Sequence, residues 1–314
     1  MEHKALVSIA LCTYNGEEFL REQLESIVNQ TYSPIELIIV DDSSSDNTYE
    51  ILVEFAANHT FIKLFQNLEN IGYIKNFEKA LNLCSGDFIA LSDQDDIWDR
   101  TKIEKQVNKI GSNLLIYHDS EFIDQHGQSF NKRMSDIMNL YRGNEPEAFL
   151  FFNCISGHSV LMKKQLRDEL LSFPDAYFHD WWMGYVATNL GSVDFMEECL
   201  VKYRQHRKAD TNILKRKREN TTRNPVSALV KYEQKILWMR SCLNYPKNKN
   251  PAFIQKLYSA FMNNQKEFIS FGLAKLIYEN RKILFSINKK NAFSKLNFTL
   301  KELWGGKFRR LFSR

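Results

Sequence analysis

The chain has 314 residues, 44% of them hydrophobic, so it can bury a full core and still carry an appended region. No apolar run approaches the roughly 18 to 20 residues that cross a bilayer, and the N-terminus lacks a basic leader and a cleavage site, which predicts a cytoplasmic protein. The net charge of +4 is uneven, because residues 289–314 hold eight Lys and Arg against one acid and residues 202–223 hold nine against two, a pattern that favours an anionic partner.

The first half of the chain alternates short apolar runs with amphipathic segments. Such alternation predicts an α/β fold, with a mostly parallel Rossmann-like sheet and helices on both of its faces. The helices are expected after Asn15-Gly16, through Ile51 and Phe55, near Ile74–Leu83 and at Lys102–Ile110. The strands are expected at Leu6–Leu11, Ile35–Val40, Ile62–Phe65, Phe88–Leu91 and Leu114–Tyr117.

Polar residues follow three of the expected strands at the point where each strand ends. Because ligands bind beyond the carboxyl ends of parallel strands, these groups are expected to converge on one binding site. They are Thr13-Tyr14-Asn15 after the first strand, Asp41-Asp42 after the second and Asp93-Gln94-Asp95-Asp96 after the Phe88–Leu91 strand.

Beyond about Pro225 the pattern becomes helical and continues to Trp304, with a break at Pro246–Pro251. One stripe of the first of these helices is expected to be apolar and buried. It comprises Val226, Leu229, Val230, Ile236 and Leu237.

Asp93 and Asp95 occupy alternate positions, so in an extended segment both carboxylates project to one side. Two close carboxylates favour a hard divalent cation, Mg²⁺ or Mn²⁺, which also bridges phosphates and neutralises a diphosphate leaving group. The alternative is a solvated acidic turn that caps the following helix, and the two carboxylates alone do not decide between them.

An ordered set of motifs resembles the family-2 inverting glycosyltransferases of GT-A fold. The resemblance is strong to about Trp98, continues to about His206 and is absent from the helical tail. It implies transfer of one sugar from a nucleoside-diphosphate donor to a hydroxyl acceptor. The motifs are Val7–Asn15, Ile38–Asp46, Asn70-Ile71-Gly72, Asn76, Gly86–Ala90 and Ser92–Trp98.

The resemblance assigns the donor site residue by residue. Asp42 would accept a hydrogen bond from a pyrimidine N–H, Asp93 would contact ribose and metal, and Asp95 would be the principal metal ligand. The residues implied to hold the nucleotide are Thr13, Tyr14, Asn15, Asp42 and Asp93. A catalytic domain would then span 1–223, with a nucleotide-binding half of about 1–110 and an acceptor half of about 111–223, followed by a helical region at 224–314.

The resemblance also places a general base at Asp180, although His179 stands where the family usually has Glu. The alternative for Asp180 is an N-cap of the next helix, and the two roles are compatible. His179 is expected to support the site. Trp181 and Trp182 could offer an aromatic floor for a sugar, one of them lying in the core.

Three further positions complete the implied site. His206 could complete the metal shell, and Arg204 could clamp phosphate, the alternative for both being a polar strand end. Gly157-His158 stands where the family often lines the acceptor pocket.

Other classes of protein fit the sequence less well. A sugar-1-phosphate nucleotidyltransferase would open with a Gly-rich, Arg-containing loop, and a processive synthase would have membrane helices; the chain has neither. A nucleotide-sugar-binding protein without activity would not account for both Asp95 and Asp180. The segments around Ser92–Trp98, His179–Trp182 and Tyr203–His206 resemble the rhamnosyltransferase-like branch, which favours dTDP-L-rhamnose over UDP-hexoses. The expected acceptor is a glycan or a lipid-linked glycan, and no nucleic-acid partner is predicted.

The C-terminal tail has an amphipathic, basic pattern. It would suit peripheral association with an anionic membrane at the inner face of the cell membrane, or packing on the catalytic domain with solvated cations. The apolar positions are Phe293, Leu296, Leu300, Leu303 and Trp304, and the cations are Lys295, Lys301, Lys307, Arg309, Arg310 and Arg314.

Overall fold

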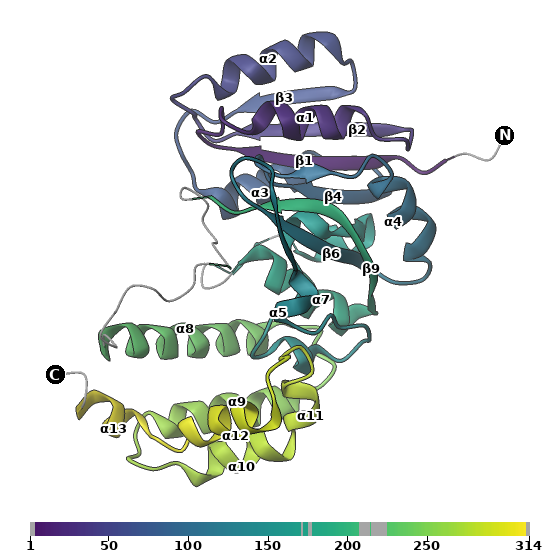
Figure 1. Cartoon of the computed structure of the whole chain (residues 1–314). Coiled ribbons are helices and arrows are strands. Elements are labelled where there is room, and N and C mark those ends of the chain that lie inside the picture. The colour runs from purple at the N-terminus through teal and green to yellow at the C-terminus, as the bar shows by residue number, and fades with distance from the viewer. Residues whose placement is uncertain (1–3, 171, 175–177, 207–213, 215–224, 312–314) are drawn as a thin grey trace.

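The structure is a computed structural model that describes residues 4–170, 172–174, 178–206, 214 and 225–311. A sheet-centred part built by the N-terminal two thirds of the chain stands above a stack of C-terminal helices (Figure 1). In the described part of the chain, no helix combines the length and the apolar character needed to cross a bilayer.

One mixed, nine-stranded sheet organises the upper part, in the order β3-β2-β1-β4-β8-β6-β9-β5, with β7 paired to β6. Strands β1 to β4 of the first half are mutually parallel where they pair, as the alternating pattern predicted. The second half adds the parallel pair β6–β9 and antiparallel pairings to the same sheet. The strands are β1 Val7–Thr13, β2 Ile35–Asp41, β3 Ile62–Gln66, β4 Phe88–Ser92, β5 Ile97–Trp98, β6 Leu115–Ile123, β7 Ser129–Arg133, β8 Leu161–Lys163 and β9 Val193–Arg204.

Helices cover both faces of the sheet, because successive side chains of the buried central strands point to opposite sides. Along β1, Ile9 and Leu11 face a core shared with α1, α2 and α4, whereas Ala10 faces a core shared with α3 and α7. The helices of this part are α1 Leu20–Val28, α2 Thr48–Asn58, α3 Tyr73–Leu83, α4 Lys102–Ile110, α5 Met134–Ile137, α6 Lys164–Leu170 and α7 His179–Leu190, with 3₁₀ turns η1 at Pro146–Phe149 and η2 at Gly157–Ser159.

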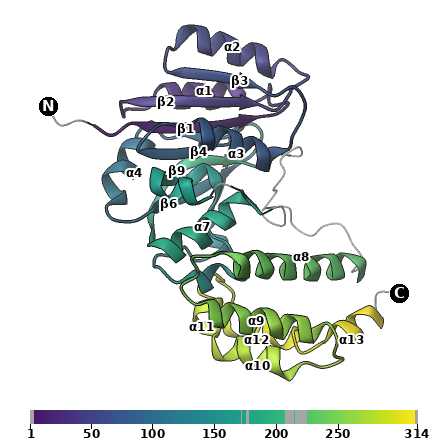
Figure 2. The same ribbon diagram turned by 180° about the vertical axis from the view of Figure 1, so that it is seen from behind.

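The C-terminal helices join the second core through aromatic side chains. Trp238 of α8 is fully buried and contacts Trp181 and Trp182 of α7, which lies between the sheet and α8 (Figure 2). Phe285 and Phe298 pack on the Phe151–Phe152 segment of the upper part. These helices are α8 Pro225–Asn244, α9 Pro251–Asn264, α10 Phe271–Glu279, α11 Arg281–Leu284, α12 Ala292–Lys301 and α13 Gly306–Leu311.

The buried face of α8 differs from the predicted stripe. Ile236 of that stripe is buried, but Val230 and Leu237 are exposed, whereas Trp238, Met239 and Cys242 are fully buried. The prediction counted aliphatic residues, but α8 packs through larger side chains against the aromatic residues of α7. The side chains of Val226 and Leu229 lie outside the described residues.

Candidate active site

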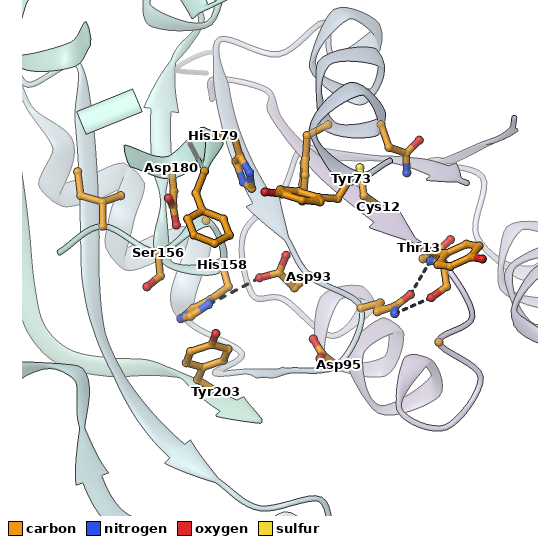
Figure 3. Close-up of a pocket in the computed structure, with 18 of the residues that line it drawn as sticks. Cys12, Thr13, Tyr73, Asp93, Asp95, Ser156, His158, His179, Asp180 and Tyr203 are labelled. Atoms are coloured by element: carbon orange, nitrogen blue, oxygen red, sulfur yellow. Dashed lines mark hydrogen bonds and ion pairs between the residues drawn. The ribbon is translucent and has the colours of Figure 1, made fainter. Parts of the chain in front are cut away.

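A cavity of about 1180 Å³ opens beyond the carboxyl ends of β1, β2 and β4. Thr13, Asp42 and Asp93 line it, so the three strand ends meet at one rim as the pattern predicted. Asp180 and His158 lie across the cavity from Thr13, with Asp93 between the two groups (Figure 3). The predicted site residues that line the cavity are Thr13, Tyr14, Asn15, Asp42, Asp93, Asp95, Gly157, His158, His179, Asp180, Trp181 and His206.

The loop after β1 is fixed by a buried carboxylate that sequence reasoning did not assign. Asp41 accepts hydrogen bonds from the hydroxyls of Thr13, at 2.9 Å, and Ser44, at 2.6 Å. Asn15 has a left-handed backbone (φ 47°), which Asn tolerates better than most residues, and its side-chain oxygen accepts from the backbone N–H of Ser45. Hydrogen bonds therefore hold the carboxyl ends of β1 and β2 together.

Gln94, between the two carboxylates of the Asp93–Asp95 motif, ties that loop to the loop after β1. Its side-chain oxygen accepts from the Tyr14 N–H at 2.8 Å, and its amide donates to the Tyr14 carbonyl at 3.0 Å. A Cβ added at Gly16 would lie 2.3 Å from the Gln94 oxygen, so Gly16 leaves the space that this clamp needs. The sequence showed the adjacency of Gln94 to the motif but not this partner.

Asp42 is buried and organises the segment before α3. One of its oxygens accepts from Asn67 at 2.7 Å and from the Ile71 N–H at 2.9 Å, and the other accepts from the Gly72 N–H at 2.9 Å. Gly72 has a φ of 82°, which favours glycine. A carboxylate offers about four acceptor positions, so one remains beside the Gly72 contact for a ligand N–H.

Asp95 and His206 lie in direct contact at the cavity, with His206 Nε2 2.7 Å from Asp95 Oδ2. Arg204 lies next to this pair, and its Nε donates to the Asp95 carbonyl at 2.8 Å. Its guanidinium also pairs with Glu22 and lies over the Phe19 ring. Arg204 is 1% exposed and does not line the cavity. The prediction that Arg204 clamps phosphate is therefore wrong, because its buried guanidinium is bound to carbonyl and carboxylate oxygens of the protein.

A second acidic cluster involves His158. Three potential metal-ligand atoms, one each from Asp93, Asp96 and His158, all lie within 4.8 Å of one another. His158 Nδ1 is 3.5 Å from Asp96 Oδ2 and 3.8 Å from Asp93 Oδ2, and its Nε2 is 2.8 Å from the Ser120 hydroxyl. Asp93 therefore lies with this cluster, which differs from the predicted grouping with Asp95 and His206.

Asp96 and Lys102 are two buried ionisable residues near this cluster. Both are fully buried, and Asp96 Oδ2 and Lys102 Nζ have no hydrogen-bond partner among the described atoms. Burial raises the pKa of Asp96 well above its ordinary value, and the Asp95 and Asp93 carboxylates add to the rise. Burial lowers the pKa of Lys102, whereas Asp96 and Asp93 oppose that effect. The expected helix Lys102–Ile110 gave no sign that its first residue is buried.

Asp180 stands in the first turn of α7, where Phe178 is the N-cap residue. It is half-buried, and its Oδ1 accepts from the Asn153 amide at 3.1 Å. Burial raises the pKa of Asp180 to about 7, backbone N–H groups such as that of Trp181 oppose the rise, and Asp93 adds to it. The N-cap alternative is wrong for this residue, and a carboxyl that titrates near neutrality suits proton transfer.

His179 lies beside Asp180 in an aromatic environment. Its ring stacks on Phe77 at 4.5 Å between centroids, and it is 7% exposed. Burial lowers the pKa of His179 to about 4, so the ring is neutral at physiological pH, and Asp93 opposes this shift. His179 thus supports the shape of the site and is not a second cationic group.

The two tryptophans of α7 have different environments. Trp181 lines the cavity and donates its indole N–H to the Phe149 carbonyl. Trp182 is 7% exposed and packs on Tyr185, Trp238 and Tyr245, away from the cavity. Trp182 is therefore the core residue of the pair, and Trp181 is the one of the two that could form the predicted aromatic floor for a sugar.

Comparison with known proteins identifies the family. Residues 8–170, more than half of the chain, match the sequence model described as "Glycosyl transferase family 2". The chain belongs to this family. An uncharacterized glycosyltransferase of Haemophilus influenzae is 30% identical over 237 residues, which cover 71% of this chain and 72% of the relative. One of Methanocaldococcus jannaschii is 32% identical over 212 residues, 64% of this chain and 71% of the relative.

Solved structures show the same fold. TarS 1-349 of S. aureus in complex with UDP superposes with a TM-score of 0.57 at 19% identity, covering 92% of this chain and 74% of TarS 1-349. The mannosyltransferase PcManGT from Pyrobaculum calidifontis, in complex with GDP-Man and Mn²⁺, superposes with a TM-score of 0.56 at 16% identity, covering 99% and 88%. This family-2 chain thus has the GT-A-like α/β sheet, followed by the helices α8 to α13, and is a nucleotide-sugar glycosyltransferase.

Proposed function

We propose that this family-2 glycosyltransferase inverts the configuration of the transferred sugar, with Asp180 as the general base. The acceptor hydroxyl would give its proton to Asp180 while its oxygen attacks the anomeric carbon, and the diphosphate would leave from the opposite face. The observation that carries the proposal is the half-buried Asp180, whose pKa is raised to about 7, on the same cavity as the strand-end carboxylates.

The donor would lie along the rim that Thr13, Tyr14 and Asn15 form with Asp42. The remaining acceptor position on Asp42 suits a pyrimidine N–H, because the other positions already hold Asn67 and the 71–72 backbone. The structures of TarS with UDP and with UDP-GlcNAc support a pyrimidine nucleotide. Resemblance of three motifs to the rhamnosyltransferase-like branch favours dTDP-L-rhamnose, and a UDP-hexose is the alternative.

The residues at the cavity fit a Mg²⁺ or Mn²⁺ ion. Asp95 and His206 offer a carboxylate oxygen and an imidazole nitrogen in contact with each other, and Asp93 offers a further carboxylate on the same cavity. When bound, the ion would neutralise the charge that develops on the diphosphate. The PcManGT complex with Mn²⁺ supports a metal. The cluster of Asp93, Asp96 and His158 is the alternative site, although buried Asp96 does not line the cavity.

We further propose that the C-terminal region, separated from the catalytic domain at about residue 223, contacts an anionic membrane through α12. Phe293, Leu296 and Leu300 share one face of α12 and are 77%, 42% and 46% exposed, so this face does not pack on the catalytic domain. On the same helix, Lys301 is exposed and Lys295 is partly buried. Arg309 does not face an anionic surface as the pattern predicted, because it pairs with Glu302 and lies over the Tyr232 ring. Arg314 and the side chain of Arg310 lie outside the described residues.

One assay tests the activity directly. Purified protein is incubated with dTDP-L-rhamnose and with UDP-hexoses, with Mn²⁺, and nucleoside diphosphate release is measured. Release with one donor, lost in Asp180→Asn while nucleotide binding persists, supports the proposal. Asp180→Asn that retains wild-type transfer would show that another group is the base.

A further inference from the structure

The cavity has one wall that differs from the donor rim. We call the side chains of Met138, Phe151, Phe152 and Trp181 the apolar wall, and all four line the cavity. Phe151 is 8% exposed, whereas Met138, Phe152 and Trp181 are partly exposed and pack against the same core. The donor rim, by contrast, is formed by hydroxyl, amide and carboxylate groups.

The C-terminal helices hold the apolar wall in place. The ring of Phe152 lies 5.9 Å from that of Phe285 and 5.7 Å from that of Phe298, measured between centroids. Trp181 contacts Trp238 of α8 at 5.5 Å. These supporting residues belong to α8, α12 and the segment after α11, so the C-terminal helices pack directly on the wall.

The wall begins beside the proposed base. Asn153, which directly follows Phe152, donates to Asp180, and Trp181 directly follows Asp180 in α7. Because Asp180, Phe152 and Trp181 line the same cavity, an acceptor whose hydroxyl reaches Asp180 would have a neighbouring part of its structure near the wall.

The chemistry of the wall selects what that part can be. A sugar ring can stack its apolar face on Trp181, but Met138, Phe151 and Phe152 offer no hydrogen-bond donor or strong acceptor, so a further hydroxylated ring against them would lose hydrogen bonds to water. An alkyl or aryl group would instead bury apolar surface. We infer that the acceptor carries a hydrophobic aglycone next to the accepting hydroxyl. The inference rests on the proposed role of Asp180.

Matched alkyl glycosides test this inference by binding alone. Binding of octyl β-D-glucoside, below its micelle concentration, and of methyl β-D-glucoside is measured by quenching of tryptophan fluorescence in the full chain. We expect the octyl compound to bind about tenfold more tightly or better, because the methyl compound lacks the apolar chain. Phe152→Ala should remove most of that preference.

Phe293→Ala is the matched control, because it also truncates a Phe but on the exposed face of α12, away from the cavity. Preference retained in Phe293→Ala and lost in Phe152→Ala supports the inference. Equal affinity for both glycosides, or preference lost only in Phe293→Ala, overturns it, the latter showing adhesion to the exposed face.

Met138→Ala is a second variant in case Phe152→Ala does not fold, because Met138 is only partly buried. Met138→Ala should also reduce the preference for the octyl compound. Thermal melting shows whether both variants are folded. An unchanged preference in a folded Met138→Ala and a folded Phe152→Ala overturns the inference. Diphosphate release and its dependence on Asp180 are measured on the same samples, so failure of the acceptor inference is distinguished from failure of the proposed function.

Discussion

The replacement Asp180→Asn separates chemistry from binding and from stability. Asn keeps the size of the side chain and can still accept the hydrogen bond from Asn153, but it cannot take a proton. We expect transfer to fall by on the order of 10² to 10⁴, the usual range for a lost acid–base group. Nucleotide affinity should stay within about twofold, because the donor rim lies across the cavity.

The raised pKa of Asp180 also predicts an effect on stability. The folded protein holds the proton up to a pKa of about 7, whereas the ordinary value is 3.8. The free energy of unfolding should therefore fall as pH rises from about 4 to about 7 and remain lower above that range. The full difference corresponds to about 4 kcal/mol, an upper bound that solvent in the cavity reduces to roughly 1–2 kcal/mol.

Denaturant unfolding at pH 5 and pH 8 measures this effect. Asp180→Asn should be more stable than wild type at pH 8, by about 1–2 kcal/mol, with a smaller difference at pH 5. Asp168→Asn, at an exposed position next to Arg167, serves as the control and should not gain stability at pH 8. A variant that is less stable than wild type at pH 8 would refute the reasoning.

The same titration predicts that the rate of transfer by wild type falls on the acidic side of about pH 7, because only ionised Asp180 can accept a proton. A rate that is flat between pH 5.5 and pH 8 would argue against Asp180 as the base.

Three other predictions concern the metal, the clamp and the tail. Chelation by EDTA should abolish transfer. Asp95→Ala should lower the rate of transfer by about 10² or more and weaken Mn²⁺ binding. A larger loss of Mn²⁺ affinity in Asp96→Ala than in Asp95→Ala would favour the cluster of Asp93, Asp96 and His158 as the metal site. Gln94→Ala should raise the KM for the donor by about three- to tenfold with little change in thermal stability, because only the two hydrogen bonds to Tyr14 are lost; an unchanged KM would mean that the clamp does not order the donor rim. Phe293→Glu should reduce sedimentation with anionic liposomes in low salt and leave diphosphate release intact, whereas equal binding of wild type and variant would exclude α12 as the contact.

The sequence predicted the part of the site that depends on periodicity and strand ends. Thr13, Asp42 and Asp93 each follow an apolar run, and parallel strands bring such ends to one edge. These features are local, so spacing alone identifies them.

Partners distant in the sequence could not be predicted in this way. The contact of Gln94 with Tyr14 spans 80 residues, and that of Arg204 with Asp95 spans 109. The predicted phosphate clamp at Arg204 was wrong because a basic residue at a strand end is usually exposed, whereas β9 pairs in parallel with β6 and places Arg204 in a buried position next to Asp95. Two of the aromatic partners of Trp182 likewise come from distant residues, Trp238 of α8 and Tyr245 just after it, in a region outside the family resemblance.

The buried ionisable residues near the Asp93–Asp96 loop suggest how that loop tolerates three carboxylates within four residues. Lys102 is the first residue of α4, where burial and the helix dipole both disfavour a cation, and the Asp96 and Asp93 carboxylates oppose the resulting fall of its pKa. Those carboxylates in turn repel one another unless a cation lies close. The raised pKa of Asp96 reduces that repulsion, because a protonated Asp96 carries no charge, and the proposed divalent ion would then meet Asp95, which lies on the cavity side with His206.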